Sequence, residues 1–486
     1  MSALSSSPPR AAASHEDLVR VFDAELARPE IEGIPIGSTL TDVLVIEFIN
    51  QGGQWGIAER WLDRLRWLRK YYSVFGRPAA RAEIKSRRIL ITWRTSTPRI
   101  NGLLLPVLDA LGSDRSTVLY EDPHVLKSFP VQTDAVKWTD AIVHDRNRWL
   151  TAFSRCWPKW RQRLQALSRS LELAPGGLKR LELSVLANSQ LVVGFKALLE
   201  RCRPTAIVTD YDRGNVSSCL VLAARSLGIP TFTLQHGVLA EYAVGYVPVV
   251  ADRMFCWGEF HRRIMTAAGQ DPARLAIGGC PRLSRDLRVE AEDVRRRMGI
   301  SDSQGVVMLG TSPVLHSQRI LLADWFCEAV SRLSGIAGIV RLHPSETREL
   351  YAGIARQHPH VQFLDNSQLS LDESLAAADV VVVQNSGLGS DALVKRRLTV
   401  VVEPPDAPSG HGKDLVEQAG CPRVAGPDEL AGALRRLLFD AEARRRQFEA
   451  AEPFVHDFCA YFGADAARRI SESVVDAIEN CNRIKQ

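Results

Sequence analysis

The sequence has no long uninterrupted apolar run and no closely paired cysteines. No segment approaches the ~18 consecutive apolar residues of a membrane-spanning helix, and the first residues lack the apolar stretch of a signal peptide. The nine cysteines are scattered, without CxxC pairs or the Cys/His spacing of zinc sites. These absences argue against a disulfide framework and a structural zinc module. They predict reduced, mostly buried thiols in a cytoplasmic protein.

An excess of charge of one sign is also missing. A net charge of +5 on 486 residues is a mild bias, which suits an anionic substrate or a membrane surface without requiring nucleic acid as a partner. The 45% apolar and 24% charged residues are those of an ordinary globular protein. Because single cores stop growing at about 250–300 residues, the length predicts two domains or more.

The most informative segment runs from residue 204 to residue 237. A short apolar strand, a polar turn, a helical pattern and a second apolar strand follow one another, which predicts a β-α-β unit. Asp210 and Asp212 follow the first strand, and His236 follows the second. Because ligands of parallel sheets bind outside the carboxyl ends of the strands, these three residues are expected in one crevice.

Three strand ends in the second half of the chain have a form that suits phosphate. A run of four valines at 380–383 leads into a Ser/Gly turn that opens a helix, so backbone amides and the helix dipole would point at the crevice. A Gly-Thr-Ser turn after another strand repeats this geometry, and an Arg-x-His-Pro sequence adds a fixed charge and a hydrogen-bond donor. The residues predicted to hold the donor are Arg341, His343, Ser386, Gly387, Gly310, Thr311, Ser312 and Asp391.

Each of these residues also has a structural interpretation. His236 suits a general base near neutral pH, or else a histidine bonded to neighbouring backbone. Asp212 is a base for the acceptor, an orienter of His236, or the cap of the helix that follows. His343 and the Ser386 turn could simply cap helices. Asp210 and Asp212 form an Asp-x-Asp that could chelate a metal, but they lie in the domain opposite the phosphate turns, so we expect no metal.

Strands alternate with helices on both sides of residue 250, which predicts two parallel sheets. The second series is expected to begin near residue 254 and to include a strand at 275–277. The predicted organisation is a disordered tail (1–14), a helical N-terminal extension (15–85), a Rossmann-like acceptor domain (86–250) with a helical insertion (125–203), a Rossmann-like nucleotide-sugar domain (251–440) and C-terminal helices (441–486).

The helical insertion is rich in arginine, lysine and tryptophan, including Trp149, Trp157, Lys159 and Trp160. It has two interpretations. It is a solvated basic helix with aromatic core anchors, or it is a surface that rests on anionic lipid or binds an anionic acceptor.

A set of motifs in fixed order carries a family resemblance. They are Gln235-His236-Gly237, Tyr246-Val247-Pro248, Ala251-Asp252, Trp257-Gly258-Glu259, Gly279-Cys280-Pro281-Arg282, Arg341-Leu342-His343-Pro344 and Asn385-Ser386-Gly387. Over residues 204–440 the chain resembles GT-B glycosyltransferases of bacterial surface and capsular polysaccharide, and the related CDP-glycerol glycerophosphotransferases. The resemblance implies His236 as catalytic base, and His343 and the Ser386 turn as holders of the donor phosphates.

A second group is similar in part. The His-Pro and serine pair resembles transferases of CMP-Kdo and CMP-sialic acid, in which an aspartate of the first domain is the base. The teichoic-type enzymes usually have Asp-Tyr-Ser-Ser where this chain has Gln384-Asn385-Ser386-Gly387, and the Asp210-Tyr211-Asp212 turn fits the CMP-sugar group better.

The sequence therefore predicts an α/β protein of GT-B fold, with two Rossmann-like domains facing across a cleft. We expect a metal-independent, cofactor-free glycosyltransferase that moves a sugar or polyol phosphate from a nucleotide-activated donor, CMP- or CDP-linked, to a glycan or lipid-linked acceptor. Its expected role is capsule, O-antigen or lipopolysaccharide synthesis in the cytoplasm, with peripheral contact at the inner face of the membrane. The alternatives are a UDP-sugar transferase or UDP-GlcNAc 2-epimerase-like enzyme, and a non-catalytic scaffold subunit of polysaccharide assembly.

Overall fold

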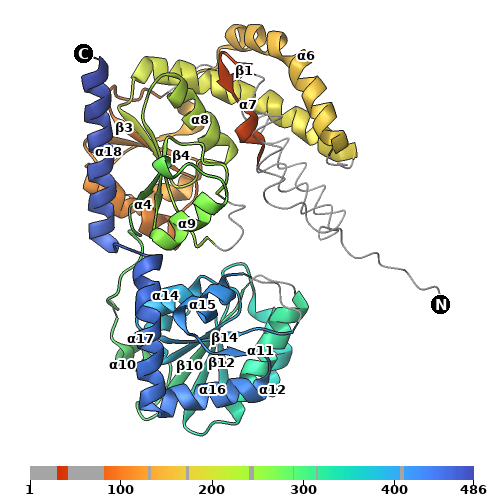
Figure 1. Cartoon of the computed structure of the whole chain (residues 1–486), viewed down its shortest axis with the longest axis vertical. Coiled ribbons are helices and arrows are strands. Elements are labelled where there is room, and N and C mark those ends of the chain that lie inside the picture. Colours follow the sequence, from red (N-terminus) through yellow and green to blue (C-terminus); the bar gives the residue numbers. More distant parts are fainter. Residues whose placement is uncertain are drawn as a thin grey trace, which may run out of the picture.

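The computed structural model consists of two α/β lobes, one beyond the other along the long axis of the molecule (Figure 1). Each lobe holds one parallel sheet with apolar clusters on both of its faces, which confirms the predicted pair of Rossmann-like domains. The structure describes residues 30–41, 82–129, 133–170, 175–239, 246–287, 289–312, 316–405 and 410–485. The predicted tail at 1–14 and most of the predicted helical extension at 15–85 lie outside the described residues.

The sheet of the first lobe has seven strands in the order β5-β4-β3-β6-β7-β8-β9, all parallel. Its order reverses between β3 and β6, which is where parallel sheets open a ligand crevice. The strands are β3 (Ile89–Trp93), β4 (Ser116–Tyr120), β5 (Asp134–Lys137), β6 (Ala206–Thr209), β7 (Thr231–Leu234), β8 (Arg253–Cys256) and β9 (Leu275–Ile277).

Two expectations about this sheet need correction. The strands near 254 and at 275–277, which we expected to start the second domain, pair with β7 and with each other in the first sheet. The predicted helical insertion at 125–203 contains β5, an edge strand beside β4. Local alternation of strands and helices cannot tell which sheet a strand joins, because pairing partners are chosen by the tertiary structure.

The helices of the first lobe cover both faces of its sheet. Leu90 of β3 points into one apolar cluster, whereas its neighbours Ile89 and Ile91 point into the other. The helices are α4 (Pro98–Leu111), α5 (Trp138–Ala141), α6 (Arg146–Ser170), α7 (Pro175–Cys202), α8 (Asn215–Ser226), α9 (Glu259–Ala267), α18 (Gly463–Lys485) and the 3-10 turns η1 (Gly37–Leu40), η2 (Pro123–Ser128) and η3 (Pro272–Arg274).

The second lobe contains a six-stranded parallel sheet in the order β12-β11-β10-β13-β14-β15, with its reversal between β10 and β13. The strands are β10 (Gly305–Gly310), β11 (Ile336–Arg341), β12 (Val361–Leu364), β13 (Val380–Val383), β14 (Leu398–Val402) and β15 (Arg423–Val424). The helices are α10 (Ala291–Arg297), α11 (His316–Ser331), η4 (Arg348–Tyr351), α12 (Ala352–Gln357), α13 (Leu371–Ala377), α14 (Leu388–Val394), α15 (His411–Ala419), α16 (Pro427–Phe439) and α17 (Ala441–Phe458).

The chain passes between the lobes twice, and the two crossings lie against each other. The amide of Cys280 donates to the carbonyl of Tyr461 at 2.9 Å, and the amide of Ala460 donates to the carbonyl of Trp257 at 3.0 Å. Gly279 has φ +79°, and a Cβ there would lie 2.4 Å from the Tyr461 carbonyl oxygen, so this close approach requires glycine. After the second crossing α18 returns along the first lobe and packs on α4 (Figure 1).

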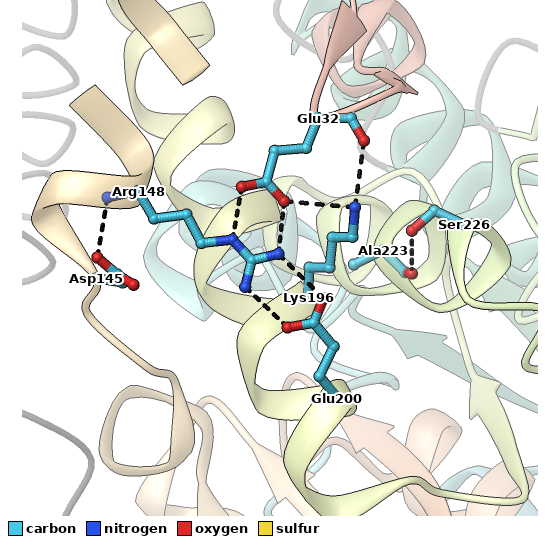
Figure 2. Close-up of polar contacts among 7 residues, drawn as sticks. All are labelled: Glu32, Asp145, Arg148, Lys196, Glu200, Ala223 and Ser226. Carbon is cyan, nitrogen blue, oxygen red and sulfur yellow. Dashed lines mark hydrogen bonds and ion pairs between the residues drawn. The ribbon is translucent and has the colours of Figure 1, made fainter. Parts of the chain in front are cut away.

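The described part of the N-terminal extension begins with a short hairpin, β1 (Glu30–Ile31) and β2 (Ile34–Pro35), where we expected helix, and the 3-10 turn η1 follows it. Its apolar residues join the cluster formed by α6, α7 and α8. Glu32, in the turn, binds Arg148 of α6 at 2.6 Å, and Lys196 of α7 lies 3.4 Å from the same carboxylate. Figure 2 shows the Arg148 guanidinium donating hydrogen bonds to Glu32 and to Glu200 of α7. These bonds link the hairpin, α6 and α7.

Among the described residues one helical stretch, Gly176–Cys202 in α7, is long and apolar enough to cross a membrane. However, 67% of its apolar window is buried inside the protein, where α7 packs between α6 and α8. This burial is that of a core helix. Eight of the nine cysteines are also buried, as the sequence predicted.

Candidate functional site

His236 lies at the carboxyl end of β7, between two tyrosine rings. The Tyr246 ring stacks on the imidazole with centroids 4.8 Å apart, and the Tyr211 ring meets it edge-on at 5.1 Å. The Tyr246 hydroxyl donates to the Gly237 carbonyl at 3.1 Å, which fixes the turn after the histidine. Nδ1 of the imidazole is buried and has no hydrogen-bond partner within the described structure.

The surroundings of His236 keep its imidazole neutral. Burial, together with the charges of Arg94 and Arg99, lowers its pKa from 6.5 to about 3. A neutral imidazole with an unused ring nitrogen is the form in which a histidine accepts a proton. An anion that offset the two arginines would raise this pKa toward its ordinary value.

Asp210 and Asp212, the two carboxylates predicted for the site, are both buried and both accept hydrogen bonds from protein groups. Asp210 accepts two hydrogen bonds from the Arg94 guanidinium, the shorter at 2.7 Å. Asp212 accepts the amides of Val250 and Ala251 at 2.6 and 2.7 Å. This corrects our expectation for Asp212, because it neither contacts His236 nor caps α8. Its carboxylate holds the β7–β8 connection, and burial raises its pKa against those two hydrogen bonds.

Arg99, in the first turn of α4, is a residue that we did not predict. Its guanidinium is exposed and has no ion pair or hydrogen bond with the part of the chain that the structure describes. Nη1 would lie 3.6 Å from a Cβ placed on Gly237. Its charge lowers the pKa of His236 and that of His343 in the other lobe. The charge of Arg99 therefore acts on both histidines from the first lobe. The only signal in the sequence was an arginine in the polar loop after a strand.

His343 follows β11 and presents one ring nitrogen outward. The amide of Ser345 donates to its Nδ1 at 3.2 Å, so Nδ1 is an acceptor and the proton of the neutral ring is on Nε2. Burial, aided by Arg99 and Arg319 and opposed by Glu346, lowers the pKa of His343. A neutral His343 with an Nε2–H group can donate a hydrogen bond to a phosphate oxygen.

Several residues predicted to hold the donor have structural partners instead. The guanidinium of Arg341 donates to the Leu369 carbonyl at 2.6 Å and to the Ser374 hydroxyl at 2.9 Å, and burial lowers its pKa to about 10. Thr311 accepts the His343 amide at 2.8 Å and donates to the buried Glu346. These hydrogen bonds fix the loops after β10, β11 and β12. Arg341 is therefore a structural residue, whereas Thr311 also lines a small hollow with Ser312 and Gln384.

Asp391 forms a buried ion pair, and Gly310 lies against a neighbouring helix. Both oxygens of Asp391 accept from Arg282, at 2.8 and 3.1 Å, with side-chain exposures of 8% and 16%. A Cβ on Gly310 would lie 2.1 Å from the Leu388 side chain, so glycine allows α14 to approach β10. The predicted donor contact of Asp391 is therefore corrected to a structural role, because Arg282 already occupies its carboxylate. Gly310 also lines a small hollow with Thr311 and Ser312, so its donor contact stays a prediction.

Ser386 and Gly387 lie where the two lobes touch. A Cβ on Gly387 would be 2.8 Å from Cγ2 of Val238, two residues after His236. Ser386 accepts the Leu388 amide at 3.3 Å, and Ser312 donates to the Asn385 carbonyl at 3.5 Å. Among the described residues the Ser386 hydroxyl has no acceptor for its hydrogen. The structure thus brings together His236, Arg99, His343, Ser312 and the Ser386–Gly387 turn, which we call the crevice.

No family model and no curated protein matches this sequence. Solved structures match its fold. UDP-GlcNAc 2-epimerase from Neisseria meningitidis bound to UDP-GlcNAc has a TM-score of 0.52 and 11% identity over 80% of this chain and 100% of that one. Anabaena HepE in complex with UDP-glucose gives 0.50 and 12%, over 80% and 99%. A Rickettsia africae glycosyltransferase gives 0.51 and 10%, over 82% and 100%. These similarities place the chain in the GT-B fold.

Proposed function

We propose that the chain is a glycosyltransferase that binds a UDP-linked sugar in the crevice. The observation that carries the proposal is the meeting of Arg99 with His236 and His343 where the carboxyl ends of both sheets face each other. A guanidinium without an ion pair among the described residues and a neutral N–H donor suit a diphosphate. The solved structures of the same fold that contain UDP-GlcNAc or UDP-glucose support a uridine nucleotide over the CMP or CDP predicted from sequence.

In the proposed reaction, an acceptor hydroxyl attacks the anomeric carbon of the donor. Its proton passes to the neutral imidazole of His236, a new carbon–oxygen bond forms, and the bond between the sugar and the diphosphate breaks. UDP leaves with the electron pair of that bond. Arg99 and Nε2–H of His343 stabilise the negative charge on the leaving phosphate, and the Ser386 hydroxyl adds a neutral donor. We infer that these groups can act without a metal ion.

The burial of the carboxylates supports a glycosyltransferase over an epimerase. A 2-epimerase needs acid and base groups on either side of the sugar ring. In the described structure Asp210, Asp212 and Asp391 are each buried with partners, and the Glu346 side chain is fully buried beside Arg319. His236 by contrast has an unused nitrogen. We therefore place the 2-epimerase second, and the role in surface polysaccharide synthesis stays a prediction from sequence.

Calorimetric titration of the full-length protein with UDP, CMP and CDP, each with and without EDTA, tests the nucleotide. We expect UDP to bind most tightly and EDTA to have no effect. Arg99→Gln should weaken UDP binding roughly 10- to 100-fold, because hydrogen bonds to charged groups contribute about 1.5–3 kcal/mol. The control is Arg356→Gln, an exposed arginine of α12, which should bind UDP as the unaltered protein does.

Each competing function gives a distinct result. Tighter binding of CMP or CDP would restore the cytidine-linked donor. Conversion of UDP-GlcNAc without an acceptor would establish the epimerase. Absence of binding to any nucleotide would favour the scaffold subunit.

A further inference from the structure

One motif of the sequence, Gly279-Cys280-Pro281-Arg282, takes no part in the proposed reaction. It lies just after β9, in the first crossing of the chain between the lobes. The Cys280 amide donates to the Tyr461 carbonyl at 2.9 Å, and the Cys280 carbonyl accepts from the Gly463 amide at 3.2 Å. These bonds fix the motif against the second crossing. Arg282 therefore projects from a fixed support where the two lobes are joined.

The guanidinium of Arg282 binds the second lobe. It donates to both oxygens of Asp391, at 2.8 and 3.1 Å, and little of either side chain is exposed. Asp391 belongs to α14, which lies at the end of the second lobe that faces the first lobe (Figure 1). The Asp391 amide donates to the Gly387 carbonyl at 3.1 Å, so one helical turn separates Asp391 from the Ser386–Gly387 turn. The ion pair therefore fixes the helix that follows this turn of the crevice.

The aliphatic part of Arg282 contacts α4 of the first lobe. Its Cγ lies 3.2 Å from a Cβ built on Gly102, so a residue without a side chain at this position lets α4 approach Arg282 closely. Gly102 and Arg99 are three residues apart and are neighbours on the surface of the helix. Arg282 thus contacts the helix that carries Arg99.

Arg282 also lies over an aromatic ring of the first lobe. Its central guanidinium carbon is 5.5 Å from the centre of the Trp257 ring, which is a cation–π contact. The amide of Trp257 donates to the Gln235 side chain at 2.9 Å, and its indole donates to the Gln235 carbonyl at 2.7 Å. Because Gln235 precedes His236, Arg282 is linked through one buried ring to the strand end that carries the histidine.

We propose that Arg282 is a positioning residue, which holds the two walls of the crevice at the separation that a diphosphate requires. The inference rests on the proposed function, in which Arg99 and His236 on one wall and the Ser386–Gly387 turn on the other contact the same ligand. Arg282 contacts all three of the segments that carry these groups, and it is bound to Asp391 by two charge-assisted hydrogen bonds. An ion pair that only stabilised the fold would not need to join both walls.

The variant Arg282→Met/Asp391→Val removes the ion pair without leaving a buried charge unpaired. Replacing a buried ion pair by apolar residues of similar volume is often neutral or stabilising, so we expect this variant to fold. Small-angle X-ray scattering of the full-length variant should give a larger radius of gyration than that of the unaltered protein, because the walls are no longer held together. Calorimetric titration should show UDP binding weakened roughly 10-fold. An unchanged radius of gyration would overturn the proposal.

A double-mutant cycle with Arg99→Gln separates positioning from a purely structural role. Because Arg282 sets the distance of Arg99 from the opposite wall, Arg99 should contribute little to UDP binding once the ion pair is absent. The effect of Arg99→Gln should therefore fall from roughly 10- to 100-fold to about threefold or less in the Arg282→Met/Asp391→Val background. Independent, additive losses of affinity would show that Arg282 does not position Arg99.

The matched control removes an ion pair three residues further along the chain. Arg285 binds Glu452 of α17 at 2.7 Å, and both side chains are exposed. Arg285→Gln/Glu452→Gln should therefore change neither the radius of gyration nor the affinity for UDP. Effects as large as those of Arg282→Met/Asp391→Val would overturn the proposal, since any ion pair near the crossings would then explain them.

A single substitution tests the contact with α4 while both charges stay in place. Gly102→Ala adds a methyl group that must displace the Arg282 stem, so we expect UDP binding to weaken about fivefold. Gly353→Ala in α12 adds the same group where nothing lies within 4 Å, and should bind UDP as the unaltered protein does. Unchanged affinity in Gly102→Ala would overturn the contact between Arg282 and α4 on which the proposal rests.

Two results separate this inference from the proposed function. Weaker UDP binding by Arg282→Met/Asp391→Val with an unchanged radius of gyration would make Asp391 a direct contact of the donor and overturn the positioning role. Absence of nucleotide binding by the unaltered protein, together with a larger radius of gyration of the variant, would reject the uridine nucleotide as ligand. Arg282 would then be retained as the residue that holds the walls.

Discussion

The two walls of the crevice come from sheets that share the same order over six strands, but their charged side chains differ in exposure and pairing. On the first-lobe wall, Arg99 is exposed and unpaired among the described residues, and His236 lies between two aromatic rings. On the second-lobe wall, Arg341 and Asp391 are buried with partners, which leaves His343 and serine hydroxyls to face the crevice. A phosphate held by both walls would take its charge from one lobe and its neutral donors from the other. Binding would then require the lobes to be together.

The largest expected effect tests whether Asp391 is structural. Asp391→Asn leaves the buried Arg282 without its carboxylate, so we expect the free energy of unfolding to fall by about 3–5 kcal/mol in urea titrations. The control is Glu452→Gln, which breaks an exposed pair with Arg285 and should cost less than about 1 kcal/mol. A stable Asp391→Asn protein that no longer binds UDP would instead return Asp391 to the donor site.

A smaller effect tests the contact between the walls. Gly387→Ala places a methyl group against Val238 and should cost about 1–3 kcal/mol, seen as weaker UDP binding or lower stability. Val238→Ala should restore most of this loss in the double variant, and the coupling is measured by a double-mutant cycle. Gly432→Ala is the control, because nothing lies within 4 Å of its added Cβ. Simple addition of the two single effects would mean that the walls do not touch in solution.

The smallest expected effect is the contribution of His236, on the first-lobe wall, to the pH dependence of the free energy of unfolding. The unfolded chain protonates His236 below about 6.5, whereas the folded protein resists protonation down to about 3. This stabilising contribution is complete above pH 6.5 and is lost as pH falls toward 3. Stability of His236→Gln should therefore depend less on pH in that window. His261, buried with a lowered pKa, contributes in the same direction, so His261→Phe is the comparison. An unchanged slope in His236→Gln would place the pKa of His236 near its ordinary value.

Much of the fold could be predicted because its determinants are local. Apolar runs such as Val380–Val383 followed by turn residues predict strands and their carboxyl ends, and the length predicts two lobes. β8 and β9 were assigned to the wrong sheet, and β5 was missed. All three depend on pairing between strands, which the pattern of one strand does not contain.

The candidate site shows the same division. The sequence by itself determined that His236, His343 and Ser386 end their strands, and the direction of parallel strands then placed them at one edge. Only the tertiary structure decided which charges are free. Arg341 forms hydrogen bonds with Leu369 and Ser374, and Asp391 forms an ion pair with Arg282, which lies 109 residues away in the sequence. Arg99 found no partner in the described chain. The sequence does not show whether a charged side chain has a partner. Burial beside a residue distant in sequence makes a charge structural, whereas a charge without such a partner is available to a ligand.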